Sequence, residues 1–447
     1  MHPRRRATAI VAAMVAAAGS GASSAVASSA VELQTKTDDP ETGGVLPRAV
    51  PAAGTFYPTT VARLLGSSDA GYAVQPGSGA TIAAAGHGGL PRSGISAVVL
   101  NVTAAAGPTD VALSFAPAGT PAPPPLLLAP TGTTRSALLT LPLGSSDSIA
   151  VTTTASAAVA ADLVGFYAAD DTVLGSHGVS GGYQPVEVTR VFDSDTAQPL
   201  AAGGRQVLAV DLGTGATPHT TALLVRATVK GAQAPGTLSV GSSAGATPSV
   251  PFVAAVPASN LAVVPASAEG DGRLDVAVTN ASTGATGVAV DLVGFYDDGA
   301  LGPNLRFRPL PQTRVVDTTS GLGTSALQPG RRTTVTPDEN VVGDSTFGVV
   351  GVATTTPAGG PAAVSVDSPE ATRSTDVEVA AGATSVPVQS QVSAGRGVGL
   401  RSRAGSPPTG VTVDVTGSFE AYPPVVNPAA RGWVAPVSGW QISATPR

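Results

Sequence analysis

Cysteine is absent from the 447-residue sequence, so the chain can form no disulfide and has no cysteine ligand or cysteine nucleophile. Charged residues make up only 12% of it, against roughly a quarter in an average globular protein, and the net charge is −6. Such a chain lacks the basic surface that nucleic-acid binding requires. With four histidines and 4% aromatic residues, it also has little material for histidine-based catalysis or for an aromatic sugar-binding platform.

The abundant residues are glycine, proline and small or β-branched side chains. Stretches such as "TDVALSF" and "RLDVAVTN" alternate apolar and polar residues, and proline and glycine interrupt them at intervals of roughly 8 to 12 residues. This pattern is typical of antiparallel sandwiches and barrels. No stretch after the N-terminal apolar run has helical periodicity, so we expect an all-β fold.

The first 27 residues have the pattern of a secretion signal. Arg4, Arg5 and Arg6 precede the apolar run "ATAIVAAMVAAA", and "AVA" at 25–27 fits a cleavage site. The apolar run is too short and too rich in alanine for a stable membrane span. We therefore expect a signal peptide over 1–27 and keep an uncleaved anchor as the alternative. Residues 28–53 are predicted to be a flexible lead-in.

Three sequence markers then recur in the same order. The first is an aromatic-x-Pro-x4-Arg opening, the second an inner strand and the third a closing strand, which reads "AADLVGFY", "AVDLVGFY" and "TVDVTGSF" in turn. The markers predict three tandem antiparallel β-sandwich modules, followed by a C-terminal tail at 423–447. We call the modules segments 1, 2 and 3, at 54–168, 181–297 and 304–422. Because the joints are short and polar, we expect each segment to own a core and to contact its neighbours modestly.

The markers resemble those of tandem β-rich modules found in secreted actinobacterial proteins. That family opens with R-[IV]-[LF]-D-T-R-x-G, continues with N-V-T-V-T and S-N-L-N, and closes with D-[LV]-x-G-[FY]-[FY]. "RVVDTTSGLG" (314–323), "LNVTA" (100–104), "SNLAV" (259–263) and the closing strands match it, over about residues 56–422. Gly66 replaces the opening Asp in segment 1, Thr319 replaces the second Arg, and the S-N-L-N element is lost in segments 1 and 3. The resemblance implies a secreted modular β-protein; such modules stand alone or beside wall hydrolases and carry no general activity.

One Arg and one Asp recur in every segment, at separations of 99, 101 and 100 residues. In the first closing strand, alternation puts Leu163 on one face and Asp162, Val164 and Phe166 on the other. Both faces are apolar, so the Asp should be buried and should need a partner. We predict three structural ion pairs, each with two hydrogen bonds, and keep a ligand or active site at the Asp row as the alternative. The pairs are Arg63–Asp162, Arg190–Asp291 and Arg314–Asp414.

The only two tryptophans, Trp433 and Trp440, lie in the C-terminal tail. Exposed tryptophan can stack on a sugar or anchor a partner, so both residues are candidates for contact with a ligand or with the cell wall. The alternative is a tail that folds back and caps segment 3.

Histidine and acidic clusters give weaker signals. His87, His177 and His219 lie in loops or joints at positions that are not equivalent between segments, which favours solvated histidines over a catalytic set. The acidic stretches "EGDGRLD" (269–275) and "YDD" (296–298) could suggest calcium, but without a 12-residue ligand loop they are more typical of turns. We therefore expect no metal, no cofactor and no catalytic residue.

Together these observations favour a non-catalytic extracellular protein, structural or adhesive, at the cell envelope. A glycan- or cell-wall-binding protein is the alternative, and a cell-wall hydrolase is a more remote one. The expected partners are cell-wall glycan or another envelope protein. We expect no nucleic-acid partner and no membrane span in the mature chain.

Overall fold

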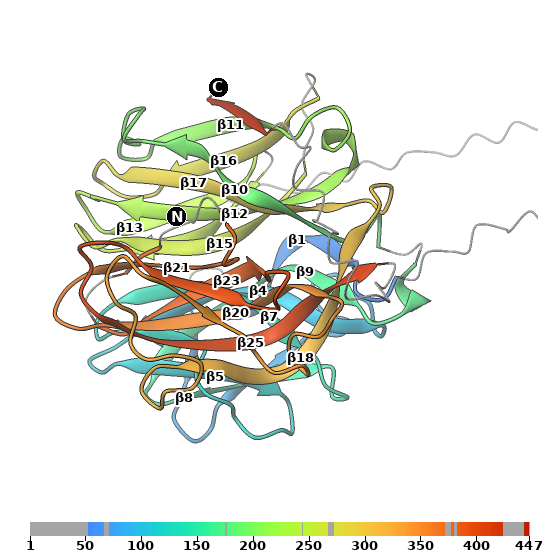
Figure 1. Cartoon of the computed structure of the whole chain (residues 1–447), viewed down its shortest axis with the longest axis horizontal. Helices are drawn as coiled ribbons and strands as arrows, with labels where there is room; N and C mark the ends of the chain where they lie inside the picture. Colours follow the sequence, from blue (N-terminus) through green and yellow to red (C-terminus); the bar gives the residue numbers. More distant parts are fainter. Residues whose placement is uncertain are drawn as a thin grey trace, which may run out of the picture. The chain divides into compact units, whose positions relative to one another are not determined.

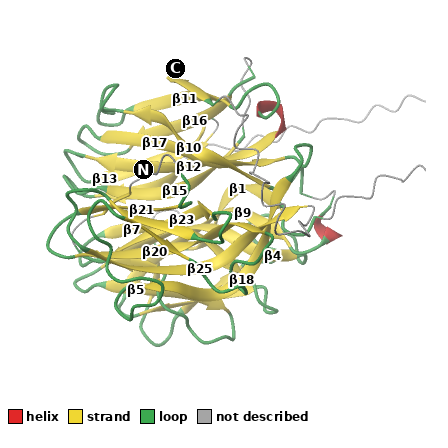
Figure 2. Cartoon of the chain, viewed as in Figure 1, coloured by secondary structure: helices red, strands yellow, loops and turns green. Residues whose placement is uncertain are grey.

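The computed structural model describes residues 52–66, 71–174, 177–243, 245–266, 272–371, 377–379, 382–422 and 442–446. These residues belong to the compact unit Val50–Arg447. Within them the chain forms antiparallel sheets, with two 3-10 turns at Asp171–Val173 and Thr217–His219 and no α-helix (Figure 2). The expectation of an all-β fold with antiparallel sheets is confirmed. The predicted signal peptide and most of the lead-in lie outside the described residues.

Segment 1 folds into two antiparallel sheets. The larger has the strand order β1-β9-β4-β7, with β2 paired to β9, and the smaller has the order β3-β8-β5-β6. Leu100 and Leu163 of the larger sheet share one hydrophobic cluster with Leu113 and Ile149 of the smaller, so the two layers enclose a core. The strands are β1 (Phe56–Leu65), β2 (Tyr72–Val74), β3 (Ala80–Ala83), β4 (Ile95–Ala106), β5 (Val111–Pro117), β6 (Leu127–Ala129), β7 (Thr134–Pro142), β8 (Ser148–Thr153) and β9 (Ala157–Ala168).

Segment 2 has the same arrangement. Its larger sheet has the order β10-β17-β12-β15, and its smaller sheet has the order β14-β13-β16-β11 with β26 added at the edge. Leu208 and Leu292, one from each sheet, lie in a single buried cluster. The strands are β10 (Tyr183–Asp193), β11 (Arg205–Asp211), β12 (Thr220–Lys230), β13 (Gly236–Ser242), β14 (Gly245–Phe252), β15 (Ala258–Pro265), β16 (Leu274–Asn280) and β17 (Gly287–Asp297).

Segment 3 repeats the pattern, with sheets β18-β25-β20-β23 and β19-β24-β21-β22. Its larger sheet continues that of segment 2 through a single residue pair, Tyr183 opposite Leu305, to give eight strands (Figure 1). The strands are β18 (Asn304–Asp317), β19 (Arg332–Val335), β20 (Thr346–Pro357), β21 (Ala362–Asp367), β22 (Val377–Val379), β23 (Thr384–Gln391), β24 (Val398–Ser402) and β25 (Thr409–Tyr422).

The end of the tail does not cap segment 3. Its described part, β26 (Ser443–Pro446), pairs with β11 and so completes the smaller sheet of segment 2, as the red strand beside β11 shows (Figure 1). Residues 423–441, which include Trp433 and Trp440, lie outside the described residues.

A β-bulge changes the faces predicted for the first closing strand. Leu163 and Gly165 of β9 lie opposite the consecutive residues Leu100 and Val99 of β4, so Val164 has no partner on β4. The extra residue returns Phe166 to the face of Leu163, and both pack in the core of segment 1. The prediction that Phe166 shares a face with Val164 is therefore wrong.

A further hydrophobic cluster joins all three segments, and we call it the central cluster. In it the aromatic ring of each opening strand packs against the closing-strand ring of the next segment, and two of the three pairs are stacked. The ring centroids of Phe56 and Tyr296 are 4.1 Å apart, those of Tyr183 and Phe419 are 4.8 Å apart, and those of Phe307 and Tyr167 are 4.2 Å apart. The contacts run from segment 1 to 2, from 2 to 3 and from 3 back to 1.

The glycine of each closing strand makes room for these rings. A Cβ added to any of these glycines would collide with the opening-strand ring of its own segment. It would lie 2.2 Å from Phe56 at Gly165, 2.4 Å from Tyr183 at Gly294 and 2.1 Å from Phe307 at Gly417. No real Cβ fits at such a distance, so the recurring "G-F-Y" and "G-S-F" endings follow from close ring packing.

The central cluster buries the outer faces of the three larger sheets. Val164, Leu224 and Val350 are among its members, and each is at most 5% exposed. Both faces of these sheets are therefore covered, one by the segment's own smaller sheet and one by the neighbouring segments. This differs from the modest contacts expected from the joints; the module boundaries themselves stay a prediction.

Candidate functional site

The structure brings the recurring Arg and Asp of each segment together. Arg63 lies opposite Asp162 on neighbouring strands, Arg190 opposite Asp291, and Arg314 opposite Asp414. In segment 1 the guanidinium donates two hydrogen bonds, Nε to Oδ1 at 2.5 Å and Nη2 to Oδ2 at 3.1 Å. Segment 3 has the same fork at 3.1 and 2.9 Å, whereas in segment 2 Arg190 Nε donates to Asp291 Oδ1 at 2.5 Å.

Burial is unequal within each pair. The Asp side chains are 9%, 5% and 2% exposed, whereas those of the Arg partners are 28%, 45% and 30% exposed. The carboxylates therefore lie inside the sheets, and the guanidinium groups cover them from the solvent side. This geometry neutralises each carboxylate where it lies.

A second Asp of the opening strand extends two of the pairs. Arg190 Nη1 also donates to Asp193, which accepts a bond of 2.6 Å from Lys230 Nζ. Arg314 Nη1 likewise donates to Asp317 at 3.5 Å. Gly66 stands at the corresponding position of segment 1.

Asp291 has a second arginine, Arg226, opposite it on the neighbouring strand β12. Burial raises its pKa, and the bond from Arg190 and the charge of Arg226 counteract part of that rise. Arg226 lies opposite Asp291 and is 4% exposed, and its burial lowers its pKa to about 10. Its Nη2 donates to the carbonyl of Pro387 in segment 3 at 3.0 Å, so this cation also links two segments.

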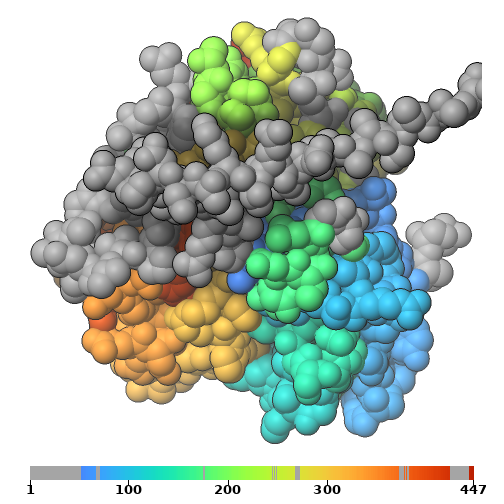
Figure 3. Space-filling model, turned by 90° about the vertical axis from the view of Figure 1, so that its right-hand side faces the viewer, coloured from blue at the N-terminus to red at the C-terminus, as the bar shows by residue number. Residues whose placement is uncertain are grey.

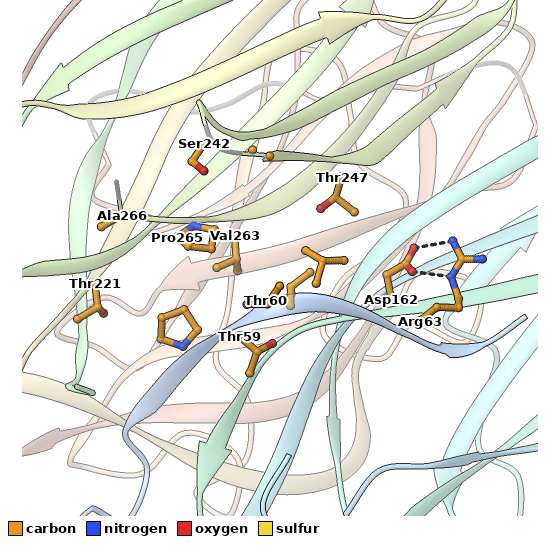
Figure 4. Close-up of a pocket in the computed structure, with 15 residues that line it drawn as sticks. Thr59, Thr60, Arg63, Asp162, Thr221, Ser242, Thr247, Val263, Pro265 and Ala266 are labelled. Atoms are coloured by element: carbon orange, nitrogen blue, oxygen red, sulfur yellow. Dashed lines mark hydrogen bonds and ion pairs between the residues drawn. The ribbon is translucent and has the colours of Figure 1, made fainter. Parts of the chain in front are cut away.

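A crevice of about 580 Å³ lies between segments 1 and 2 (Figure 4). Segment 1 contributes β1 and β9, and segment 2 contributes β13, β14, β15 and the start of β12. Arg63 and Asp162 stand at one end of the view, with their two hydrogen bonds drawn. Five side-chain hydroxyls line the crevice, those of Thr59, Thr60, Thr221, Ser242 and Thr247.

A second crevice, of about 460 Å³, occupies the corresponding place between segments 3 and 1. Pro309 and Leu310 of its opening strand correspond to Pro58 and Thr59 of the first crevice. Pro142 corresponds to Pro265, because the two prolines occupy the same register position opposite β4 and β12, respectively. Its lining is mostly proline and apolar residues. In Figure 3 segment 1 is coloured blue and cyan and segment 3 is coloured orange. Across this junction, Gln312 Nε2 of segment 3 donates a hydrogen bond to the carbonyl of Pro124 in segment 1 at 2.9 Å.

At the third such place, between segments 2 and 3, a side chain crosses the junction. Gln391 has the register position of Pro142 and Pro265. Its Nε2 donates to the carbonyl of Val186 at 3.2 Å. The three junctions thus share one backbone plan and differ in their side chains.

Two buried asparagines at the junction of segments 1 and 2 were not among the predicted site residues. Asn260 is 1% exposed; its Nδ2 donates to Asn101 Oδ1 at 3.0 Å, and its Oδ1 accepts from the backbone N–H of Leu138 at 2.9 Å. Both belong to stretches quoted above, "LNVTA" and "SNLAV". Asparagine at the middle of an apolar strand was the available signal, because a buried amide needs partners.

The weaker candidates fall into structural roles where they are described. Asp297 is fully buried and accepts bonds from the N–H groups of Gly182 and Gly299, as a turn-forming carboxylate does. His219 Nδ1 lies 2.9 Å from Asp298 Oδ2. Among the described residues no group of three or more His, Asp or Glu side chains could hold a metal ion. Residues 269–271, which hold two of the three acidic side chains of the stretch 269–275, lie outside the described residues.

No protein-family model and no curated protein matches the chain. A chain from a structure described as "Life in the extremes: atomic structure of Sulfolobus Turreted Icosahedral Virus" covers 82% of this chain and 91% of its own length, at 10% identity and a TM-score of 0.15. A likeness of this size carries no argument about fold or function. In the part of the chain that the structure describes, no helix has the length and apolar character needed to cross a bilayer.

Proposed function

We propose that this is a secreted, non-catalytic structural or adhesive protein of an actinobacterial cell envelope, built from the tandem β-rich modules that its markers resemble. The observation that carries the proposal is the role of the residues that recur. The recurring Arg and Asp bond to each other within the sheets, and the recurring aromatic residues and glycines pack the segments together. What is repeated along the chain is therefore a scaffold.

Sedimentation of the protein, without residues 1–27, with purified actinobacterial cell walls tests this proposal. A structural or adhesive protein of the envelope should be retained with the wall fraction or with its envelope proteins and should leave the wall polymers intact. Release of soluble wall fragments by the pure protein would instead support the hydrolase alternative. A protein that stays in the supernatant of walls and of whole cells would contradict the envelope assignment.

Glycan or wall binding is the second candidate, and the hydroxyl-lined crevice between segments 1 and 2 favours it. In the same assay, retention by walls from which proteins have been stripped would favour this candidate over adhesion to an envelope protein. Trp433→Ala and Trp440→Ala test the tail: loss of retention in these variants would assign the binding to the tryptophans.

A further inference from the structure

The crevice between segments 1 and 2 differs chemically from its counterpart. Both junctions have the same backbone arrangement, with the bulge of an opening strand on one side. On the other side lies the end of β15 in the first crevice and the end of β7 in the second. Yet Thr59 and Thr60 stand where Leu310 and Pro311 stand in the other crevice, and Ser242 stands where Pro117 does. The fold forms the second crevice with a lining that is mostly apolar, so the hydroxyls of the first are not a requirement of the scaffold.

The hydroxyls of the first crevice retain hydrogen-bonding capacity. Within the described part of the chain, Thr60, Ser242 and Thr247 have no side-chain hydrogen bond, and Thr59 Oγ1 is enclosed without a partner. Thr221 donates to the carbonyls of Tyr296 and Asp297 at 3.2 and 3.1 Å, which leaves its oxygen free to accept. Thr60 is exposed, so its hydroxyl can bond to a ligand that enters the crevice, and the hydroxyls of Ser242 and Thr247 likewise have unused capacity to donate and accept.

The described residues that line the crevice include one ion pair. Their charged side chains are Arg63 and Asp162, whose opposite charges compensate each other through two hydrogen bonds. A charged ligand that took Arg63 or Asp162 as its counter-charge would have to compete with that pair, which is costly because the carboxylate is only 9% exposed. A neutral ligand can meet the pair without displacing it.

We infer that this crevice binds a short neutral oligosaccharide. A sugar carries hydroxyls that both donate and accept, as the Thr and Ser hydroxyls do, and its C–H faces match the rings of Pro58 and Pro265. The volume, about 580 Å³, falls within the range of roughly 300–1,000 Å³ of small-ligand sites. The inference rests on glycan binding, the second candidate above, and places it at residues other than the tryptophans.

Isothermal titration of the chain without residues 1–27 tests the site with three probes: chitotriose, maltotriose and the peptide tri-alanine. We expect at least one sugar to bind and the peptide to show no heat. The double variant Thr60→Val and Thr247→Val keeps side-chain shape and removes two hydroxyls, and it should weaken sugar binding by about tenfold, because one hydrogen bond contributes about two- to tenfold. The matched control is Thr120→Val, at the second crevice, which should change the affinity less than twofold.

Three results would overturn the site: neither sugar binds, the peptide binds in preference to both, or the double variant and the control lose affinity equally. Circular dichroism establishes that each variant folds, and Ser242→Ala replaces the double variant if that one does not. The wall assay separates this inference from the proposed function. Binding of free sugar without retention by walls keeps the site and refutes wall association, whereas retention by stripped walls that the double variant leaves unchanged keeps the function and refutes the site.

Discussion

Phe56→Ala should destabilise more than the segment that contains it. Phe56 is fully buried; its ring stacks on that of Tyr296 of segment 2 at 4.1 Å and lies tilted against that of Tyr167 of its own segment at 5.2 Å. Removal of a buried phenyl ring costs about 3–5 kcal/mol. The upper part of that range applies here, because the residue beneath the ring is Gly165, which has no side chain that could fill the cavity.

Hydrogen exchange followed by mass spectrometry measures where this loss is felt. Because the ring packs between segments, exchange should accelerate in β17 and β12 of segment 2 as well as in β9. Phe166→Ala removes the same side chain from the core between the two sheets of segment 1, and its effect should stay within segment 1. If the two variants accelerate exchange only in segment 1, the central cluster does not couple the segments and the reasoning fails. Expression of 181–297 alone is a second check, since it exposes the Tyr296 face and should lower the melting temperature.

Three further predictions concern single sites. Asp414→Ala should cost about 2–3 kcal/mol in chemical denaturation, below the 3–5 of a fully buried pair because its Arg is 30% exposed, while Asp338→Ala on the surface should stay within about 0.5. Gly417→Ala would put a methyl 2.1 Å from a buried ring and should cost about 1–3 kcal/mol or more, against little change for Gly360→Ala, where the space is open. Burial raises the pKa of the clustered Tyr167, Tyr183 and Tyr296 above 10.0, so these phenols lose their protons in the unfolded state before they do in the folded state. The free energy of unfolding should therefore fall as pH rises through 10, by about 1.4 kcal/mol per pH unit for each phenol. Tyr183→Phe should remove one such contribution, and an unchanged slope in pH-dependent melts would contradict this.

The sequence was informative wherever a pattern recurred along the chain. Alternation and turn spacing predicted antiparallel strands, because a strand with one wet face and one dry face must alternate. The near-constant separation in sequence between the recurring Arg and Asp predicted that they pair. Arg63 and Asp162 do lie opposite each other on β1 and β9. A bulge has no comparable signature, so the face of Phe166 could not be read from period-two counting.

The association of the segments was visible in the sequence but was interpreted differently. Both faces of the closing strand are apolar, and that was taken as a reason for the Asp to be buried and paired. In a free-standing two-layer sandwich the outer face is wet, so Val164 and Val293 needed a cover that their own segments could not provide. Which segment provides it could not be predicted, because an aromatic residue at Phe56 does not specify whether Tyr296 or Phe419 will meet it.

Because β26 pairs with β11, the smaller sheet of segment 2 is completed by residues that are synthesised after segment 3. Residues 205–211 are synthesised more than two hundred positions before 443–446, and until the latter arrive one edge of β11 has no partner. Open strand edges recruit other chains, and long chains fold from their N-terminal side as they emerge. The middle segment is therefore completed after the last strands of segments 1 and 3 have been synthesised, and until then its open edge at β11 is a site where a nascent chain could aggregate.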